Sequence, residues 1–304
     1  MIFRAALKAF GPLERFSGTG YIPRMQSPPV DRTIGALRSR IALWRGARQR
    51  IALVPTMGAL HEGHLGLVRA GRLRAARVIV SIFVNPAQFA AGEDFGTYPR
   101  TEAEDLTKLA DVGVDAVFAP PVEEMYPPGF ATKITVGGPA EDLESVSRPH
   151  FFSGMATVVA RLLLLATPDV AMFGEKDYQQ LLVVRRMAAD IGMPVEIDGV
   201  PIVREADGLA MSSRNAYLSE AERTLAPTLY AALAAAADAI RGGESADMAI
   251  NGARTRLASA GFRIDYLRLR NADTLKEAKT SDEPKRLLAA VWLGKTRLID
   301  NVAV

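Results

Sequence analysis

The feature that most constrains this chain is a regular alternation of short apolar segments with helical segments between residues 33 and 203. The apolar segments are rich in β-branched residues and end near proline or glycine, which is typical of buried strands. The predicted strands cover residues 51–55, 78–86, 115–120, 170–174 and 194–201. The predicted helices cover residues 33–50, 64–76, 101–114, 154–168 and 178–192. Because such alternation builds right-handed βαβ units, the sequence predicts an α/β fold with a parallel sheet covered on both faces.

The pattern changes after about residue 203. Residues 219–240 are rich in alanine and helical in pattern, whereas residues 263–272 and 286–304 are typical of strands in an antiparallel sheet. We therefore expect two domains, the first at 33–203 and a smaller α+β domain at 204–304.

The first 32 residues fit neither domain. The segment is basic, poor in acidic residues and without the uninterrupted apolar core of a secretory signal. We interpret residues 1–32 as an N-terminal extension that is poorly ordered or lies upstream of a natural start at Met25. The alternative is an arginine-containing targeting segment.

Composition excludes several classes of protein. The chain has no cysteine, which excludes disulfide frameworks, thiolate nucleophiles and cysteine-based metal sites. The first 50 residues carry a net charge of +8, so the remaining residues sum to −5 and the body of the protein is mildly acidic. No apolar run approaches the roughly 18 residues needed to cross a bilayer. We therefore predict neither a nucleic-acid partner nor a membrane partner.

The most informative motif is a pair of histidines after the first predicted strand. His61 and His64 are two of only three histidines in the chain, and Gly58 and Gly63 flank them where a helix begins. A helix N-terminus offers free N–H groups and a partial positive charge, so phosphate could bind there and receive hydrogen bonds from both imidazoles. The alternatives are two surface histidines that cap a helix, or a metal-binding pair.

Two further segments carry cations that could reach phosphates. Lys176 follows a predicted strand and Gly174, and Ser212, Ser213 and Arg214 lie in a loop after the last predicted strand of the first domain. An ammonium, two hydroxyls and a planar guanidinium suit a phosphate clamp. The alternative for each segment is an ordinary solvated polar turn.

Four more residues are candidates for binding a small acid or a metal ion. Gln88 and Gln180 follow predicted strands, and neutral amides that both donate and accept hydrogen bonds suit a small hydroxy acid. Glu104 and Asp105 could help to hold Mg²⁺ through water, although acids are common in the first turn of a helix in any case.

From about Thr33 to its end the chain resembles the pantoate–β-alanine ligases, the pantothenate synthetase family. The matching segments are long and occur in the same order. They read "PTMGALHEGH", "SIFVNPAQF", "YPRT", "GVDAVFAP", "FGEKDYQQL", "GVPIVREADGLAMSSRNAYLS" and "TRLIDN". The resemblance implies a Rossmann-like domain of the H-x-G-H nucleotidyltransferase type that binds ATP, with a small C-terminal domain that closes over it.

The resemblance also assigns roles to single residues. It implies catalytic roles for His61, His64, Lys176 and Arg214, with His64 as the usual catalytic acid, and it places pantoate at Gln88 and Gln180, with Gln88 also near β-alanine. The implied ATP contacts are Met57, Gly58, Ala59, Leu60, His61, Glu62, Gly63, His64, Gly174, Glu175, Lys176, Asp177, Val203, Met211, Ser212, Ser213 and Arg214.

The implied reaction has two steps. The carboxylate of pantoate attacks the α-phosphate of Mg·ATP to give pantoyl adenylate and pyrophosphate, and β-alanine then attacks the acyl carbon and releases AMP. The resemblance further implies a cytoplasmic homodimer whose Mg²⁺ is held through the ATP phosphates. Positioning and cationic stabilisation can supply most of the rate in such chemistry, so a protein without cysteine is suited to it.

The chain departs from the family in one segment, and two other functions stay open. Where many members read Arg-Pro-Gly-His-Phe, this chain reads "RPHFFSG", with Phe151 at the usual histidine and His150 one residue earlier. Either His150 replaces that histidine through a shifted loop or the histidine is dispensable, and we assign His150 no role. One alternative is another H-x-G-H nucleotidyltransferase with a different small substrate, which would not release AMP. The other is a non-catalytic nucleotide- or RNA-binding protein.

Overall fold

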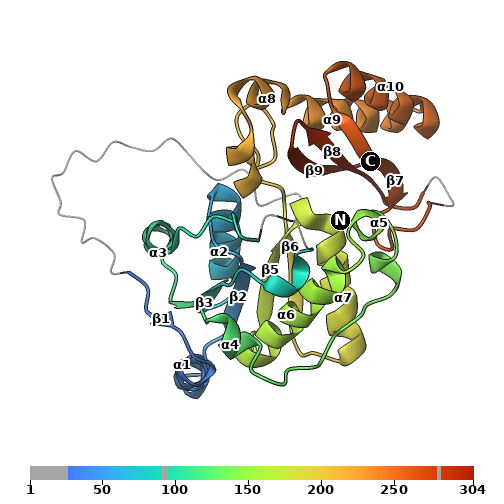
Figure 1. The fold of residues 1–304 in the computed structure, drawn as a ribbon. Coiled ribbons are helices and arrows are strands. Elements are labelled where there is room, and N and C mark those ends of the chain that lie inside the picture. The colour runs from blue at the N-terminus through green and yellow to red at the C-terminus, as the bar shows by residue number, and fades with distance from the viewer. Residues whose placement is uncertain (1–26, 91–92, 94, 279–281) are drawn as a thin grey trace, which may run out of the picture.

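The structure is a computed structural model that describes residues 27–90, 93, 95–278 and 282–304 (Figure 1). Within these residues, six parallel strands form one sheet in the order β1-β4-β3-β2-β5-β6. The strands are β1 (Val30–Asp31), β2 (Ile51–Thr56), β3 (Arg77–Ile82), β4 (Ala116–Phe118), β5 (Val170–Gly174) and β6 (Glu196–Val200). The central strands are continuous apolar runs because helices cover both faces of a parallel sheet, as the sequence pattern predicted.

Alternate side chains of each strand enter two separate cores. Ile51 and Leu53 of β2 pack with α1, α6 and α7, whereas Ala52 and Val54 pack with α2 and α3 on the other face. The helices of this layer are α1 (Ile34–Gly46), α2 (Glu62–Arg74), α3 (Glu102–Asp111), α4 (Val122–Met125), α5 (Glu144–Ser147), α6 (Phe151–Ala166) and α7 (Tyr178–Ile191). Short 3₁₀ turns lie at η1 (Pro86–Gln88), η2 (Gly138–Ala140) and η3 (Glu175–Asp177).

The C-terminal part has its own sheet and its own core, and lies above the parallel sheet in Figure 1. Its strands are antiparallel: β7 (Arg263–Asn271), β8 (Lys285–Leu293) and β9 (Thr296–Ala303). The remaining elements are η4 (Ser213–Tyr217), α8 (Glu220–Leu225), α9 (Thr228–Arg241) and α10 (Ala246–Ser259). Pro227 separates α8 from α9, which splits the single helical stretch expected at 219–240, and α10 was not predicted.

The strand order reverses beside β2, which pairs with β3 on one side and β5 on the other. In open parallel sheets, ligands bind at the carboxyl ends of strands where the order reverses in this way. The polar segment after β2 and the turn η3 after β5 both lie at that point, and η1 follows β3 beside them. The topology therefore brings three of the sequence motifs to one edge of the sheet.

The prediction for the N-terminal extension was wrong at its C-terminal end. Val30 and Asp31 form β1 and pair with Val117 and Phe118 of β4, because a short extended segment can complete the sheet at its edge. Residues 1–26 of that extension lie outside the described residues. Among the residues that the structure does describe, none of the helices is both long and apolar enough to span a membrane.

Candidate active site

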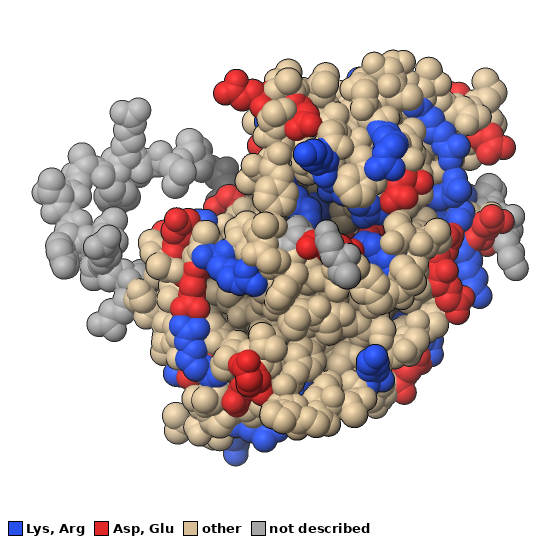
Figure 2. Space-filling model, viewed as in Figure 1, with Lys and Arg blue, Asp and Glu red and all other residues tan. Residues whose placement is uncertain are grey.

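A cavity of about 650 Å³ opens between the carboxyl edge of the parallel sheet and the C-terminal sheet. Cavities of this size hold small-molecule ligands. Figure 2 shows Lys and Arg side chains gathered around the hollow between the two parts of the molecule. The basic residues that line the cavity are Arg148, Lys176, Arg214, Lys295 and Arg297. A cationic lining of this kind suits an anionic ligand.

The turn after β2 is anchored by a buried carboxylate. The two oxygens of Asp105 accept hydrogen bonds from the backbone N–H groups of Ala59, at 2.9 Å, and Leu60, at 2.8 Å. Gly58 has a φ of +81°, which a glycine adopts without strain, and the Nζ of Lys108 donates to the carbonyl of Leu60 at 2.8 Å. The anchored turn therefore places the start of α2 at the cavity.

The two histidines cap α2 with their own side chains. Nδ1 of His61 accepts from the backbone N–H of Gly63 at 3.1 Å, and Nδ1 of His64 accepts from the backbone N–H of His61 at 3.4 Å. Because Nδ1 is an acceptor in both rings, each neutral imidazole carries its proton on Nε2. The ring centroids are 4.1 Å apart and both residues line the cavity. Both rings can thus offer an N–H group to a ligand.

The environment keeps both imidazoles neutral. Burial, reinforced by the charge of Lys176, lowers the pKa of His61 to about 4. Burial, followed by the neighbouring His61 and then Lys176, lowers the pKa of His64 to about 3. At neutral pH both rings are therefore hydrogen-bond donors and not cations.

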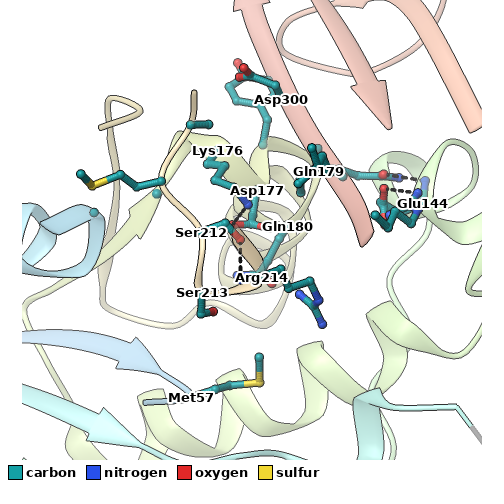
Figure 3. Close-up of a pocket in the computed structure, with 18 of the residues that line it drawn as sticks. Met57, Glu144, Lys176, Asp177, Gln179, Gln180, Ser212, Ser213, Arg214 and Asp300 are labelled. Atoms are coloured by element: carbon teal, nitrogen blue, oxygen red, sulfur yellow. Dashed lines mark hydrogen bonds and ion pairs between the residues drawn. The ribbon is translucent and has the colours of Figure 1, made fainter. Parts of the chain in front are cut away.

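The lysine of the "GEKD" segment lies on η3, directly after β5. Its Nζ is 4.0 Å from a carboxylate oxygen of Asp177, its side chain is 19% exposed, and both residues line the cavity. Figure 3 shows Lys176 and Asp177 among the residues that line the pocket. The ammonium group is thus available to an anionic ligand beside the histidines.

The Ser-Ser-Arg segment begins η4 on the C-terminal side of the cavity. Ser212 Oγ accepts from the backbone N–H of Arg214 at 3.3 Å, which caps this 3₁₀ turn. Ser213 Oγ lies 3.4 Å from the hydroxyl of Tyr98, so the turn contacts the parallel-sheet layer. All four residues line the cavity.

Gln88 is held by a chain of hydrogen bonds that fixes its amide. The hydroxyl of Tyr126 donates to Oδ1 of Asn85 at 2.6 Å, and Nδ2 of Asn85 donates to Oε1 of Gln88 at 3.0 Å. Nε2 of Gln88 then donates toward Sδ of Met57 at 3.2 Å. Since burial raises the pKa of Tyr126 to about 12, its hydroxyl keeps the proton that starts the chain. Gln88 therefore presents its NH₂ group at the side of the cavity that contains Met57.

Gln180, the second predicted glutamine, also lines the cavity, whereas the amide of its neighbour Gln179 is bonded to the protein backbone. Gln180 lines the cavity from the first turn of α7. Gln179 also lines it, but its amide is fully engaged: Nε2 donates to the carbonyls of Pro139 and Asp142, and Oε1 accepts from the N–H of Glu144 at 3.1 Å (Figure 3). Gln179 thus fixes the wall while Gln180 faces the ligand space.

The structure gathers most, but not all, of the predicted residues around this cavity. Those that line it are Met57, His61, Gly63, His64, Gln88, Gly174, Lys176, Asp177, Gln180, Val203, Met211, Ser212, Ser213 and Arg214. Those that do not line it are Gly58, Ala59, Leu60, Glu62, Glu104, Asp105 and Glu175. The first three form the turn anchored by Asp105, whose oxygens are both occupied, and Glu104 is exposed on α3.

Asn85 and Tyr98 line the cavity but were not predicted as site residues. Asn85 stands in the "NPAQF" segment at the end of a strand, so its position carried the signal. Tyr98 and Tyr126 come from loops after β3 and β4, and their approach depends on tertiary packing that no local pattern records.

The segment that departs from the family pattern forms one wall of the cavity. The guanidinium of Arg148 lies 4.0 Å from the ring centroid of Phe151 and bonds both carboxylate oxygens of Glu93, at 2.8 and 2.7 Å. Its Nη2 also donates to the carbonyl of Gln88 at 3.3 Å. His150 is exposed and does not line the cavity, so Phe151 occupies this wall through stacking on an arginine.

Among the described residues, no group of three or more histidine, aspartate or glutamate side chains could hold a metal ion. Four acidic residues line the cavity: Glu93, Glu144 and Asp300 each pair with an arginine, and Asp177 lies 4.0 Å from the ammonium of Lys176. This donor set does not build a protein cage for Mg²⁺, but it is compatible with a cation carried by phosphate groups.

Comparison with known proteins shows the family to which the chain belongs. A family model described as pantoate-beta-alanine ligase matches residues 30–303. The chain is 56% identical to a pantothenate synthetase of Mesorhizobium japonicum over 92% of this chain and 99% of that protein. It is 54% identical to one from Rhodopseudomonas palustris (strain BisA53), with the same coverage of each chain.

Two solved structures are also similar. A crystal structure of pantothenate synthetase from Thermus thermophilus has a TM-score of 0.85 at 48% identity and covers 90% of this chain and 98% of its own. A pantoate-beta-alanine ligase from Francisella tularensis, in complex with β,γ ATP and β-alanine, has a TM-score of 0.74 at 32% identity. That match covers 91% of this chain and 97% of the other.

Proposed function

The chain belongs to the pantoate–β-alanine ligase family, and from this premise we propose that its cavity joins pantoate to β-alanine with ATP as the energy source. The observation that carries the proposal is the meeting of two imidazoles, two cations and two glutamines around one cavity. The imidazoles and cations suit a triphosphate, and the neutral amides suit a hydroxy acid. Few other ligand pairs need both sets of groups in one space.

The first step of the proposed reaction forms an acyl adenylate. A carboxylate oxygen of pantoate attacks the α-phosphorus of ATP, the bond to the β-phosphate oxygen breaks, and pyrophosphate leaves. The Nε2–H groups of His61 and His64 donate to the phosphate oxygens, while Lys176 and Arg214 stabilise the charge that grows on the α-phosphate and the leaving pyrophosphate. His64, the catalytic acid expected from the family, thus acts as a neutral donor at this step.

The second step forms the amide. The amine of β-alanine attacks the acyl carbon of the adenylate, loses a proton and expels AMP. Gln88 and Gln180 hold the pantoyl group in place for both steps, which lowers the entropic cost of bringing the reacting atoms together. The family resemblance also implies that Gln88 is near β-alanine.

Mg²⁺ would be bound through the phosphates of ATP, where it would neutralise charge on the leaving pyrophosphate. The arginine-paired carboxylates of the cavity argue against a dedicated protein site. We also propose a cytoplasmic homodimer, as the family resemblance implies. Light scattering coupled to size-exclusion chromatography tests the dimer, and cell fractionation tests the compartment.

The test of the proposed function measures both products separately. Purified protein is given Mg·ATP and pantoate, with and without β-alanine, and pyrophosphate and AMP are quantified. We expect pyrophosphate to need pantoate, and AMP to appear only when β-alanine is present. Nucleotidyl transfer without AMP release would support a different H-x-G-H nucleotidyltransferase. Absence of both products would overturn the substrate assignment.

A further inference from the structure

The C-terminal sheet reaches across to the turn that carries Lys176. Nδ2 of Asn301, on β9, donates to the backbone carbonyls of Glu175 and Lys176, at 2.9 and 3.0 Å. Asn301 is only 3% exposed. One side-chain amide from β9 is therefore hydrogen-bonded directly to the backbone of Lys176.

A second residue of the same sheet orients that amide. Arg286, on β8, donates from Nε to Oδ1 of Asn301 at 2.6 Å and from Nη2 to the carboxylate of Glu175 at 2.9 Å. Its guanidinium lies 3.8 Å from the ring centroid of Tyr178, the first residue of α7. Because Oδ1 is committed as an acceptor, the NH₂ group of Asn301 must face η3.

The docking of the two sheets does not depend on this amide. Arg297, on β9, bonds both carboxylate oxygens of Glu144, on α5, at 2.8 Å, and the hydroxyl of Tyr178, on α7, donates to the carbonyl of Ala272 at 3.0 Å. The pair between Arg297 and Glu144 is mostly buried. The amide of Asn301 thus has a narrower effect: it fixes η3 relative to a sheet that is already in place.

We infer that Asn301 is a positioning residue, whose two hydrogen bonds to η3 set the place of the Lys176 ammonium for adenylate formation. The inference rests on the proposed function, since it concerns the step that Lys176 serves. A displacement of about 1 Å at a charged group costs a large fraction of its transition-state stabilisation. Asn301 itself lines the cavity, and it thereby acts on the phosphate site through the backbone of η3.

The sharpest variant is Asn301→Asp, which keeps the shape and the bond from Arg286 but replaces the donors with a carboxylate oxygen facing two carbonyls. We expect kcat for pantoate-dependent pyrophosphate release to fall about tenfold, with KM for pantoate unchanged, because the lost interaction belongs to the transition state. Asn301→Ala, which adds no charge, should show a smaller loss of the same kind. Asn271→Asp is the matched control: the same substitution on β7, outside the cavity lining, should leave kcat unchanged.

A double-mutant cycle separates positioning from general damage. If Asn301 acts through Lys176, Asn301→Asp should change the rate of the Lys176→Ala enzyme by less than about twofold. If the rate of the double variant fell by the product of the two single losses, the inference would be overturned. So would equal losses in Asn301→Asp and Asn271→Asp.

A crystal structure of Asn301→Asp without substrate tests the same point independently of the reaction. We expect η3 and the Lys176 ammonium to move while β8 and β9 keep their positions; an unmoved lysine would overturn the inference. If the unmodified enzyme released no pyrophosphate with pantoate, the proposed function would fail, and this structure would still decide the role of Asn301.

Discussion

The two ends of the cavity achieve their chemistry by opposite means. At the phosphate end, formed by His61, His64, Lys176 and Arg214, the donors that face the cavity are Nε2–H groups and cations. At the acid end, the amide of Gln88 is fixed in advance by Asn85 and Tyr126. From this difference we propose that the phosphate end stabilises charge that develops during reaction, whereas the acid end selects and orients a substrate.

The largest expected effect comes from removing a donor at the phosphate end. His64→Ala and Lys176→Ala should each reduce the rate of adenylate formation by at least about two orders of magnitude, because each removes a partner of the transition-state charge. Pantoate-dependent pyrophosphate release under single-turnover conditions measures this rate. Circular dichroism and thermal melting should show an intact fold.

Two matched controls make this prediction specific. His150→Ala changes the third histidine, which is exposed and outside the cavity lining, and Lys133→Ala changes an exposed lysine in a loop. Both variants should retain normal rates. Near-normal turnover in His64→Ala or Lys176→Ala would remove that residue from the mechanism, and a large loss in His150→Ala would give that residue a role.

The next effect is on stability in acid, and it is confined to the phosphate end. Both histidines have a lowered pKa in the folded protein, about 4 for His61 and about 3 for His64, against about 6.5 in an unfolded chain. Between pH 6.5 and 4 the unfolded chain therefore binds more protons, so the free energy of unfolding falls as the pH is lowered through this window. By pH 5 the loss is on the order of 2 kcal/mol for each histidine.

Urea unfolding at pH 5 and pH 7 measures this loss. His61→Gln or His64→Gln should make the difference between the two pH values smaller, because the substituted side chain does not titrate. NMR titration of the ring signals follows the same groups directly. A ring pKa near 6.5 for His61 or His64 in the folded protein would contradict the prediction.

The sequence predicted the parallel-sheet layer well because its signal is local. Continuous apolar runs marked β2, β3 and β5, and amphipathic segments of helical period marked α2 and α7. The order of the strands was not predicted, since no local pattern states which strands pair. The two-residue β1 is too short to produce a periodic signal.

The sequence predicted those site residues whose type and position after a strand indicate a chemical role. It did not predict residues whose role depends on tertiary contacts. His61, Lys176 and Gln88 were found from their positions after strands. Asp105 illustrates the limit: acids are common in the first turn of a helix, and only the folded chain brings its carboxylate to the backbone of the turn after β2. Asn301 stood in a segment that matched the family, yet its contact with η3 spans 125 residues of sequence.

At the acid end, Gln88→Ala should affect binding and leave the phosphate end intact. We expect KM for pantoate to rise about tenfold, because an amide that fixes substrate orientation is lost, while the affinity for ATP is preserved. Steady-state kinetics with each substrate in turn, and calorimetry with a non-hydrolysable ATP analogue, separate the two effects. An equal loss of affinity for pantoate and for ATP would indicate misfolding and would contradict a separate role for the acid end.

The smallest expected effect tests whether the acid end is fixed in advance. Tyr126→Phe removes the hydroxyl that donates to Asn85 and keeps the ring, which packs 5.1 Å from Phe130 and 6.1 Å from Phe83 between centroids. Without that donor the Asn85 amide keeps only its longer bonds, from the N–H of Ala87 at 3.3 Å and to the carbonyl of Gly154 at 3.2 Å, so it holds Gln88 less firmly. We expect a rise of about threefold in KM for pantoate, of the size of one neutral hydrogen bond, with no change in the rate of adenylate formation at saturation.

Phe130→Leu, which alters the same aromatic cluster without touching the hydrogen-bond chain, is the control. If both variants changed KM for pantoate equally, packing and not the hydrogen-bond chain would orient Gln88. If Tyr126→Phe lowered the rate at saturation instead, the acid end would take part in the chemistry that we assign to the phosphate end.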